Sequence, residues 1–141
     1  MGEARKVMDR VTKAVFAQDV KTLGKLYAPD AIADTPDQGE IKGREEIVNY
    51  LNEFLVAFPD AKYDTTRKHE AGDTAIDEGY FTGTHTGPLH GPEGQVIPPT
   101  GKRVSMRSCD MATCENGLVT SHRFYFDQVD FLTQLGLMPE L

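Results

Sequence analysis

The sequence predicts an α+β fold in which helices pack on one face of a curved, mostly antiparallel sheet. Apolar residues recur with helical spacing in three segments that precede Pro59. After Pro59 the spacing changes to the alternation of a β-strand, and it keeps that period through four successive segments. Helices followed by a run of strands are typical of an α+β protein.

Two helices are predicted in the first part of the chain. Residues 3–18 form the first, and residues 19–27 form a short second helix in which Asp19 can cap the N-terminus. Pro29 ends this second helix because proline interrupts helical hydrogen bonding. The apolar face of the first helix is formed by Val7, Met8, Val11, Ala14 and Val15, and that of the second by Leu23, Leu26 and Tyr27.

The third helix is predicted over residues 43–58 and ends at Pro59. Its apolar stripe has the spacing of an amphipathic helix and consists of Ile47, Leu51, Phe54, Leu55 and Phe58. The preceding residues 29–43 are acidic and rich in turn formers, so they predict at most a short strand or two.

Four strands follow, with hairpin turns at the AGD and ENG sequences. They are predicted at residues 63–71, 73–87, 102–115 and 117–127. The last stretch, residues 128–141, has the pattern of a short helix or tail. Between the second and third strands, the glycine- and proline-rich run from Gly83 to Lys102 cannot be the interior of a regular element.

The composition is that of an ordinary globular protein. The 141 residues predict a single domain, residues 1–141, and no apolar run has the length of a membrane span or a signal segment. We therefore expect a cytoplasmic protein without a membrane partner. The net charge of −7 and the lack of a basic stripe predict no nucleic-acid partner.

The two cysteines, Cys109 and Cys114, fall on one predicted strand. Five residues at ~3.3 Å each separate them by roughly 16 Å, whereas a disulfide requires Cα atoms within ~7 Å. The sequence therefore predicts free thiols, which fit a reducing compartment.

The strand pattern places a carboxylate on the face that should meet the helices. Alternation over residues 102–115 puts Val104, Met106, Ser108, Asp110, Ala112 and Cys114 on this inward face. In the last strand, Phe124 and Phe126 facing inward would bring His122 with them. The outward positions would then be Cys109, Met111, Val119 and Tyr125, and their apolar character predicts a homodimer that buries one sheet face.

Several short motifs resemble the SnoaL-like polyketide cyclase family. They are GTHTGPL, IPPTGKRV, NGLVTSHRFYFD and FLTQLGL, in that order along nearly the whole chain. The resemblance implies a nuclear-transport-factor-2-like fold, which is a cone of curved sheet closed by three helices around a pocket. It also implies that the connection from Gly83 to Lys102 shapes the pocket entrance or a dimer edge, with a purely structural connection as the alternative.

The resemblance further implies a type of chemistry. Cyclases of the family close a ring by intramolecular aldol condensation without a metal or a cofactor, and other relatives are linked to hydroxylation. The family's acid/base aspartate aligns with Phe124, its histidine with Asp110 and its glutamine with Ser108. This chain therefore lacks the family's acid/base group at the usual position.

Asp110 and His122 are the candidate catalytic residues. A carboxyl group in an apolar pocket suits proton transfer near neutral pH, and a neighbouring histidine can share its proton or orient it. The alternatives are a structural aspartate and a satisfied core histidine. Candidate substrate-binding residues are His85, Ser108, Phe124, Tyr50 and Phe54, although His85 could instead hold the loop backbone, and Tyr50 and Phe54 could belong to the core.

The sequence thus predicts a cofactor-free enzyme that acts by general acid/base chemistry on a small hydrophobic, carbonyl-bearing, polyketide-like molecule. The alternatives are a non-catalytic binding protein, a hydroxylation-related member of the family, or an interaction module whose own side chains fill the pocket. No metal is expected, because the spacing of His85 and His90 matches no recognised ligand motif. One of Asp77 and Glu78 must point inward or toward a dimer partner, but the pattern leaves open which.

Overall fold

A computed structural model describes residues 2–91 and 93–138. The helices are α1 (Glu3–Phe16), α2 (Val20–Gly24), α3 (Arg44–Ala57) and α4 (Gln128–Gln134). The strands are β1 (Tyr27–Thr35), β2 (Gly39–Lys42), β3 (Lys62–Ala71), β4 (Thr74–Thr84), β5 (Leu89–His90), β6 (Val96–Ile97), β7 (Arg103–Glu115) and β8 (Leu118–Phe126).

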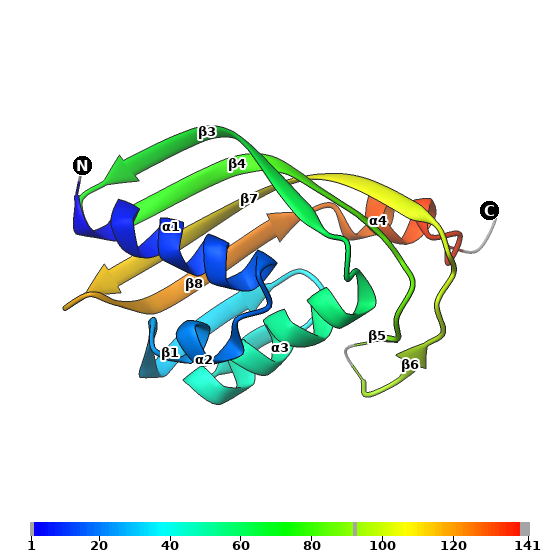
Figure 1. Cartoon of the computed structure of the whole chain (residues 1–141), viewed down its shortest axis with the longest axis horizontal. Coiled ribbons are helices and arrows are strands. Elements are labelled where there is room, and N and C mark those ends of the chain that lie inside the picture. Colours follow the sequence, from blue (N-terminus) through cyan, green and yellow to red (C-terminus); the bar gives the residue numbers. More distant parts are fainter. Residues whose placement is uncertain (1, 92, 139–141) are drawn as a thin grey trace.

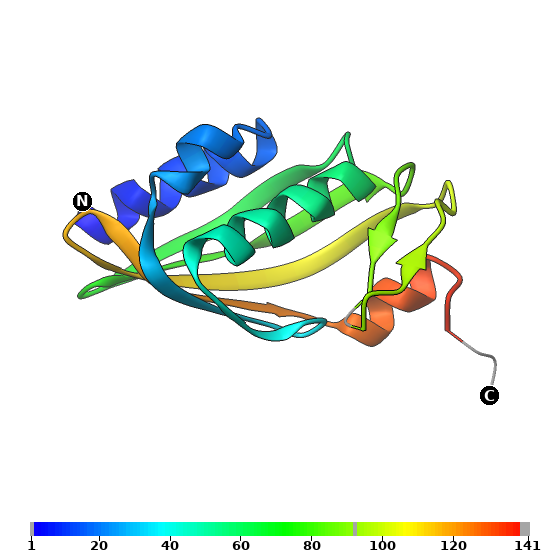
Figure 2. The same cartoon turned by 90° about the horizontal axis from the view of Figure 1, so that it is seen from below.

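Six strands form one curved sheet in the order β2-β1-β8-β7-β4-β3. The β1–β8 pair is parallel and the other pairs are antiparallel. Helices α1, α2 and α3 lie on the same face of this sheet, and the sheet curls beneath them (Figures 1 and 2). The predicted α+β fold is confirmed.

The segment before α3 differs from the prediction. Helix α2 ends at Gly24, and Tyr27 begins a nine-residue strand rather than ending a helix. The inward positions of this strand are mostly small residues, Ala31, Ala33 and Thr35, which give a weak strand signal in the sequence. An irregularity in the β1–β8 register between Tyr27 and Ile32 accommodates Pro29, which occupies the strand without donating a hydrogen bond.

Hydrogen bonds hold the N-terminal end of α1 against the sheet. The Glu70 carboxylate on β3 accepts hydrogen bonds from the backbone N–H groups of Gly2 and Arg5, at 2.8 and 2.9 Å. A negative charge at this end of a helix is favoured by the unpaired N–H groups and the helix dipole. Arg5 then reaches inward to the buried Asp77 of β4. These contacts fix α1 across β3 and β4.

The β7–β8 pairing contains a register shift between Thr113 and Cys114. An extra residue on β8 reverses the alternation, because the side-chain period of a strand is two. As a result Val119 is fully buried, and its predicted outward position is wrong. His122 remains on the inward face, as expected, and is 2% exposed.

The connection between β4 and β7, described over residues 85–91 and 93–102, contains the short β5–β6 hairpin and is called the arm below. At its base, His85 exchanges backbone hydrogen bonds with Lys102 and Gly101. At its start, the N–H groups of Thr86 and Gly87 both donate to the Ala57 carbonyl at the end of α3, each at 3.1 Å. Figure 2 shows the arm beside α3 and α4 at one end of the sheet.

Asp127 caps α4 by accepting a hydrogen bond from the Asp130 N–H. The predicted C-terminal helix is therefore present. Across the described ranges, no helix is long and apolar enough to cross a membrane.

Candidate active site

A cavity of about 110 Å³ lies between the helices and the inner face of the sheet. Helices α1 and α3 contribute one side, and β7 and β8 contribute the other. Most of the wall is aromatic or aliphatic, and the rings include Phe16, Tyr50, Phe54, Tyr63, Phe81 and Phe124. Asp110 is the charged side chain of this lining.

Three side chains from three adjacent strands form a hydrogen-bonded chain that ends at the cavity. The Tyr27 hydroxyl of β1 lies 2.6 Å from His122 Nδ1, and His122 Nε2 lies 2.7 Å from Asp110 Oδ2. Tyr27 is fully buried and His122 nearly so, whereas the Asp110 side chain is 19% exposed. Asp110 is thus the most accessible member of the chain, and His122 also borders the cavity.

The hydrogen-bond partners of Tyr27, His122 and Asp110 determine where the protons of these three side chains lie. Burial, reinforced by the neighbouring Asp110 charge, raises the pKa of Tyr27 well above its usual value, so its hydroxyl keeps its proton. That proton is donated to Nδ1, and the Nε2–H of a neutral imidazole is donated to the Asp110 carboxylate. An imidazolium would leave the buried Tyr27 proton without an acceptor among the described residues.

Phe124 packs against the face of the His122 imidazole. The two rings stack with centroids 4.0 Å apart and an interplanar angle of 25°. Phe124 is also the cross-strand partner of Asp110 in the β7–β8 register. Asp110 therefore lies directly opposite the position at which the family pattern would place its aspartate.

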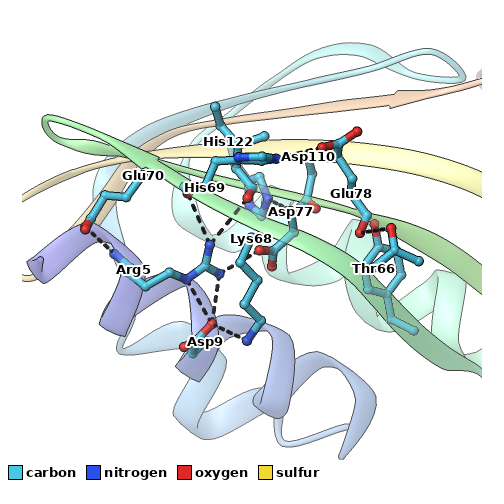
Figure 3. A network of polar contacts seen from close by, with 12 residues as sticks. Arg5, Asp9, Thr66, Lys68, His69, Glu70, Asp77, Glu78, Asp110 and His122 are labelled. Carbon is cyan, nitrogen blue, oxygen red and sulfur yellow. Dashed lines mark hydrogen bonds and ion pairs between the residues drawn. The ribbon is translucent and has the colours of Figure 1, made fainter. Parts of the chain in front are cut away.

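Asp77 is the inward-facing member of the pair that the sequence left open, and it is 2% exposed. Its Oδ1 lies 2.7 Å from Arg5 Nη2, but the contact lacks hydrogen-bond alignment. Burial and the charge of Asp110 raise the pKa of Asp77, although Arg5 opposes this shift. Glu78 faces the other way and contacts His69 at 2.7 Å. Figure 3 shows this network with Asp110 and His122 beside it.

The positive charges of Arg5 on α1 and Lys68 on β3 are balanced by acidic partners. Asp9 receives hydrogen bonds from Arg5, at 2.8 and 3.2 Å, and from Lys68 at 3.1 Å. Together with Asp77, this gives two carboxylates for two cationic side chains. The charge of Asp110 is not part of this balance.

The other predicted binding residues also reach the cavity, with the exception of His85. Tyr50, Phe54, Ser108 and Phe124 all line it. The Tyr50 hydroxyl donates to Asp37 Oδ1 at 2.8 Å, and the Ser108 hydroxyl donates to the Tyr63 hydroxyl at 3.3 Å.

His85 lies outside the cavity lining, at the base of the arm. Its Nδ1 accepts a hydrogen bond from the Thr100 N–H at 3.1 Å, and its ring packs on Phe58 with centroids 5.3 Å apart. The side chain is fully buried, and burial lowers the pKa of His85. This geometry matches the alternative in which His85 holds the loop backbone.

Cys109 also borders this cavity. Burial and the nearby Asp110 charge raise the pKa of Cys109, which disfavours the nucleophilic thiolate. Within residues 2–91 and 93–138, no cluster of three or more histidine, cysteine, aspartate or glutamate side chains could hold a metal ion.

Sequence reasoning missed Tyr27 and Tyr63 as parts of the site. Tyr27 was placed on a helix, so its proximity to the last strand could not be foreseen. The one available signal was chemical, because a buried tyrosine hydroxyl usually requires a partner. Tyr63 is the second residue of β3 and pairs with Phe81, and its contact with Ser108 depends on how far the sheet curves.

Residues 5–135 match the sequence profile of the family described as SnoaL-like polyketide cyclase. No curated protein matches the chain. A candidate SnoaL-like polyketide cyclase from Jannaschia sp. CCS1 has a similar structure, with 19% identity, a TM-score of 0.84 and coverage of 97% of this chain and 94% of that one.

Two solved Streptomyces structures are 25% identical to this chain. AclR from S. galilaeus, a candidate hydroxylase, has a TM-score of 0.78 and covers 97% of this chain and 87% of its own. IdmH from S. antibioticus, a candidate polyketide cyclase, has a TM-score of 0.73, with coverage of 93% and 96%.

Proposed function

The chain belongs to the SnoaL-like polyketide cyclase family, and we propose that it is a cofactor-free enzyme that uses Asp110 as a general base on a small hydrophobic carbonyl compound. The observation that carries this proposal is the Tyr27–His122–Asp110 chain, which presents one oriented carboxylate at an apolar cavity. A carboxylate held in one orientation beside a bound ligand is placed to accept a proton from it.

The proposal accounts for the missing family aspartate. The resemblance places an aspartate on the last strand and a histidine on the strand before it. Here the aspartate is on β7 and the histidine is on β8, and Asp110 directly faces Phe124 across the two strands. The two residue types are therefore retained with their strands exchanged, and the carboxylate still points into the same cavity.

In the proposed reaction, Asp110 removes a proton from the carbon next to a carbonyl group. The C–H electron pair moves toward the carbonyl oxygen to form an enolate, and Asp110 becomes a carboxylic acid that can return the proton at another position. His122 and Tyr27 are positioning residues, because both nitrogens of His122 are already engaged. The hydroxyl group of Thr12 at the cavity wall is available to donate to the enolate oxygen.

Hydrogen–deuterium exchange tests this proposal without knowledge of the natural substrate. Proton NMR in D₂O would follow loss of the α-hydrogens from a panel of ketones, such as cyclohexanone and 2-tetralone. We expect the protein to accelerate exchange of at least one ketone, and Asp110→Asn to reduce that acceleration at least about 100-fold with little change in melting temperature. Asp64→Asn, the same chemical change at an exposed position of β3, is the matched control.

Full exchange activity in Asp110→Asn would remove Asp110 from the reaction. A wild-type protein that binds ketones without accelerating exchange would favour the non-catalytic binding alternative.

We also propose that the protein is a homodimer located in the cytoplasm. On the sheet face opposite the helices, Tyr80 is 40% exposed and Tyr125 is 53% exposed, which supports an interface there.

The proposed location rests on the cysteines. Cys109 and Cys114 are both free, which supports a reducing compartment.

A further inference from the structure

The cavity wall carries a negative charge with no positive charge to balance it. Asp110 lines the cavity, whereas none of the described lining residues is a lysine or an arginine. A neutral His122 orients the Asp110 carboxylate through its hydrogen bond without cancelling its charge. Arg5 of α1 and Lys68 of β3 are held by Asp9 and Asp77.

The rest of the wall is suited to a cation. Aromatic faces attract positive charge, and the attraction grows when the site excludes water. Phe16 packs near both Tyr63 and Phe81, at 6.1 and 6.2 Å, and Tyr50 packs near both Phe54 and Phe124, at 6.2 and 6.3 Å. All of these rings line the cavity, so a ligand would meet aromatic side chains from both helices and from the sheet.

We propose that the cavity selects a small apolar molecule with a positively charged amine, either protonated or quaternary, and excludes carboxylates and phosphates. This proposal narrows the substrate class of the proposed function and rests on it only for the placement of the ligand beside Asp110. A partly buried carboxylate gains the most from a partner of opposite charge, and an anion would meet only repulsion from Asp110.

A cationic substrate would also supply the positive charge that stabilises the enolate in the proposed reaction. An enolate is negative, and the described cavity wall offers the Thr12 hydroxyl as a donor but no cationic side chain to stabilise it. An ammonium group on the substrate, close to the carbonyl, would provide that positive charge and would acidify the neighbouring C–H bond. The substrate class that follows is an amino ketone or a related amine-bearing carbonyl compound.

Three probes of nearly equal shape separate charge from size. Choline carries a cation, 3,3-dimethylbutan-1-ol is its neutral analogue, and 3,3-dimethylbutanoate is an anionic analogue. Binding of each to wild type, Asp110→Asn and Asp64→Asn would be measured by NMR titration at constant ionic strength. We expect wild type and Asp64→Asn to bind choline about tenfold or more tightly than the neutral alcohol, and to bind the anion least.

In Asp110→Asn the choline-to-alcohol ratio should fall toward one, with the aromatic rings keeping a smaller preference for choline, while binding of the alcohol itself is retained. Phe124→Leu provides a second variant, because removal of one ring should weaken choline more than the alcohol. Equal binding of choline and the alcohol by wild type, or tighter binding of the anion, would overturn the proposal. These ratios do not depend on turnover, so a charge preference without α-proton exchange would refute the enzyme proposal alone, and exchange without a charge preference would refute this one alone.

Discussion

His85 and His122 are both buried, and their ring nitrogens meet different partners. His122 is held on both sides, by Tyr27 at Nδ1 and by Asp110 at Nε2. His85 accepts the Thr100 N–H at Nδ1, and its Nε2 has no hydrogen-bond partner among the described residues. His85 must therefore stay neutral to keep the arm attached, and its role is in stability rather than in the cavity.

This arrangement predicts a pH dependence of stability. Because burial lowers the pKa of His85 in the folded protein, the unfolded chain binds the proton first as the pH falls through ~6.5. Stability from His85 is thus present above that pH and is lost below it, by at most about 1.4 kcal/mol per pH unit, until the folded protein is protonated as well. His85→Asn, whose side-chain oxygen can accept the Thr100 N–H, should remove this contribution.

Urea unfolding between pH 5 and 7.5 measures the effect. Subtraction of the variant's profile from that of the wild type isolates His85 from the other titrating groups. A difference that stays constant over this pH range would show that His85 is not held neutral.

Single residues were predictable from sequence when their element was predicted correctly. Alternation along β7 and β8 was enough to bring Asp110 and His122 to the same face. Tyr27 was assigned to the wrong element, so its hydrogen bond to His122 was missed. His85 was predicted at the end of a strand and lies one residue beyond β4, but the sequence could not show whether its ring turns toward the cavity or toward Thr100.

At the level of elements, the arm depends on close contact with the end of α3. Gly87 passes so near the chain that an added Cβ would meet the Val56 carbonyl oxygen. The same segment donates two backbone hydrogen bonds to Ala57. Glycine is needed here because of the close approach of two backbones.

Gly87→Ala should therefore destabilise the protein by about 1–3 kcal/mol, because the arm must move away from α3. Gly24→Ala in α2 is the matched control, since no atom lies within 4 Å of its added Cβ. The control should be neutral or stabilising by up to about 1 kcal/mol. Chemical denaturation of both variants gives the comparison, and an unchanged Gly87→Ala stability would contradict the described packing.

The elements that the sequence predicted poorly are those with weak or interrupted patterns. Long helices and strands with regular apolar spacing were found within a few residues of their observed ends. The first strand was underestimated because its buried positions are mostly alanine and because Pro29 interrupts it. The extra residue on β8 could not be detected, since a strand pattern carries no sign of a change in register.

At the level of the whole molecule, the helices cover one sheet face and leave the other open (Figure 2). Cys109 and Met111 of β7 are partly buried on or beside this open face, and Tyr125 of β8 is 53% exposed. Tyrosine is common at the energetic centre of protein interfaces. Val119 no longer contributes to this surface, but the aromatic part of the predicted interface remains.

Sedimentation should show a dimer at micromolar concentration, and Tyr125→Glu should weaken it at least about tenfold by placing a charge in the interface. Val20→Glu, a similar change on the helical side of the molecule, should leave the dimer intact. A wild-type protein that sediments as a monomer at this concentration would contradict the proposed interface.

The overall α+β arrangement could be predicted because it requires only the order of helices and strands and their apolar faces. The cavity charge could not be predicted, because it depends on which buried groups find partners. Asp9 and Asp77 are balanced by Arg5 and Lys68 only after α1 docks on β3 and β4. The charge left on Asp110 is therefore a property of the assembled molecule.

The central claim is that a neutral His122 presents an ionised Asp110 to the cavity. Long-range ¹H–¹⁵N NMR of the histidine side chains tests this claim most directly, because it reports the protonation of each ring nitrogen. With His122 assigned by comparison with a His122→Gln variant, we predict at neutral pH a neutral ring with the proton on Nε2 and none on Nδ1. A ring protonated on both nitrogens would mean that the Asp110 charge is cancelled, and it would contradict both the proposed base and the proposed preference for a cationic ligand.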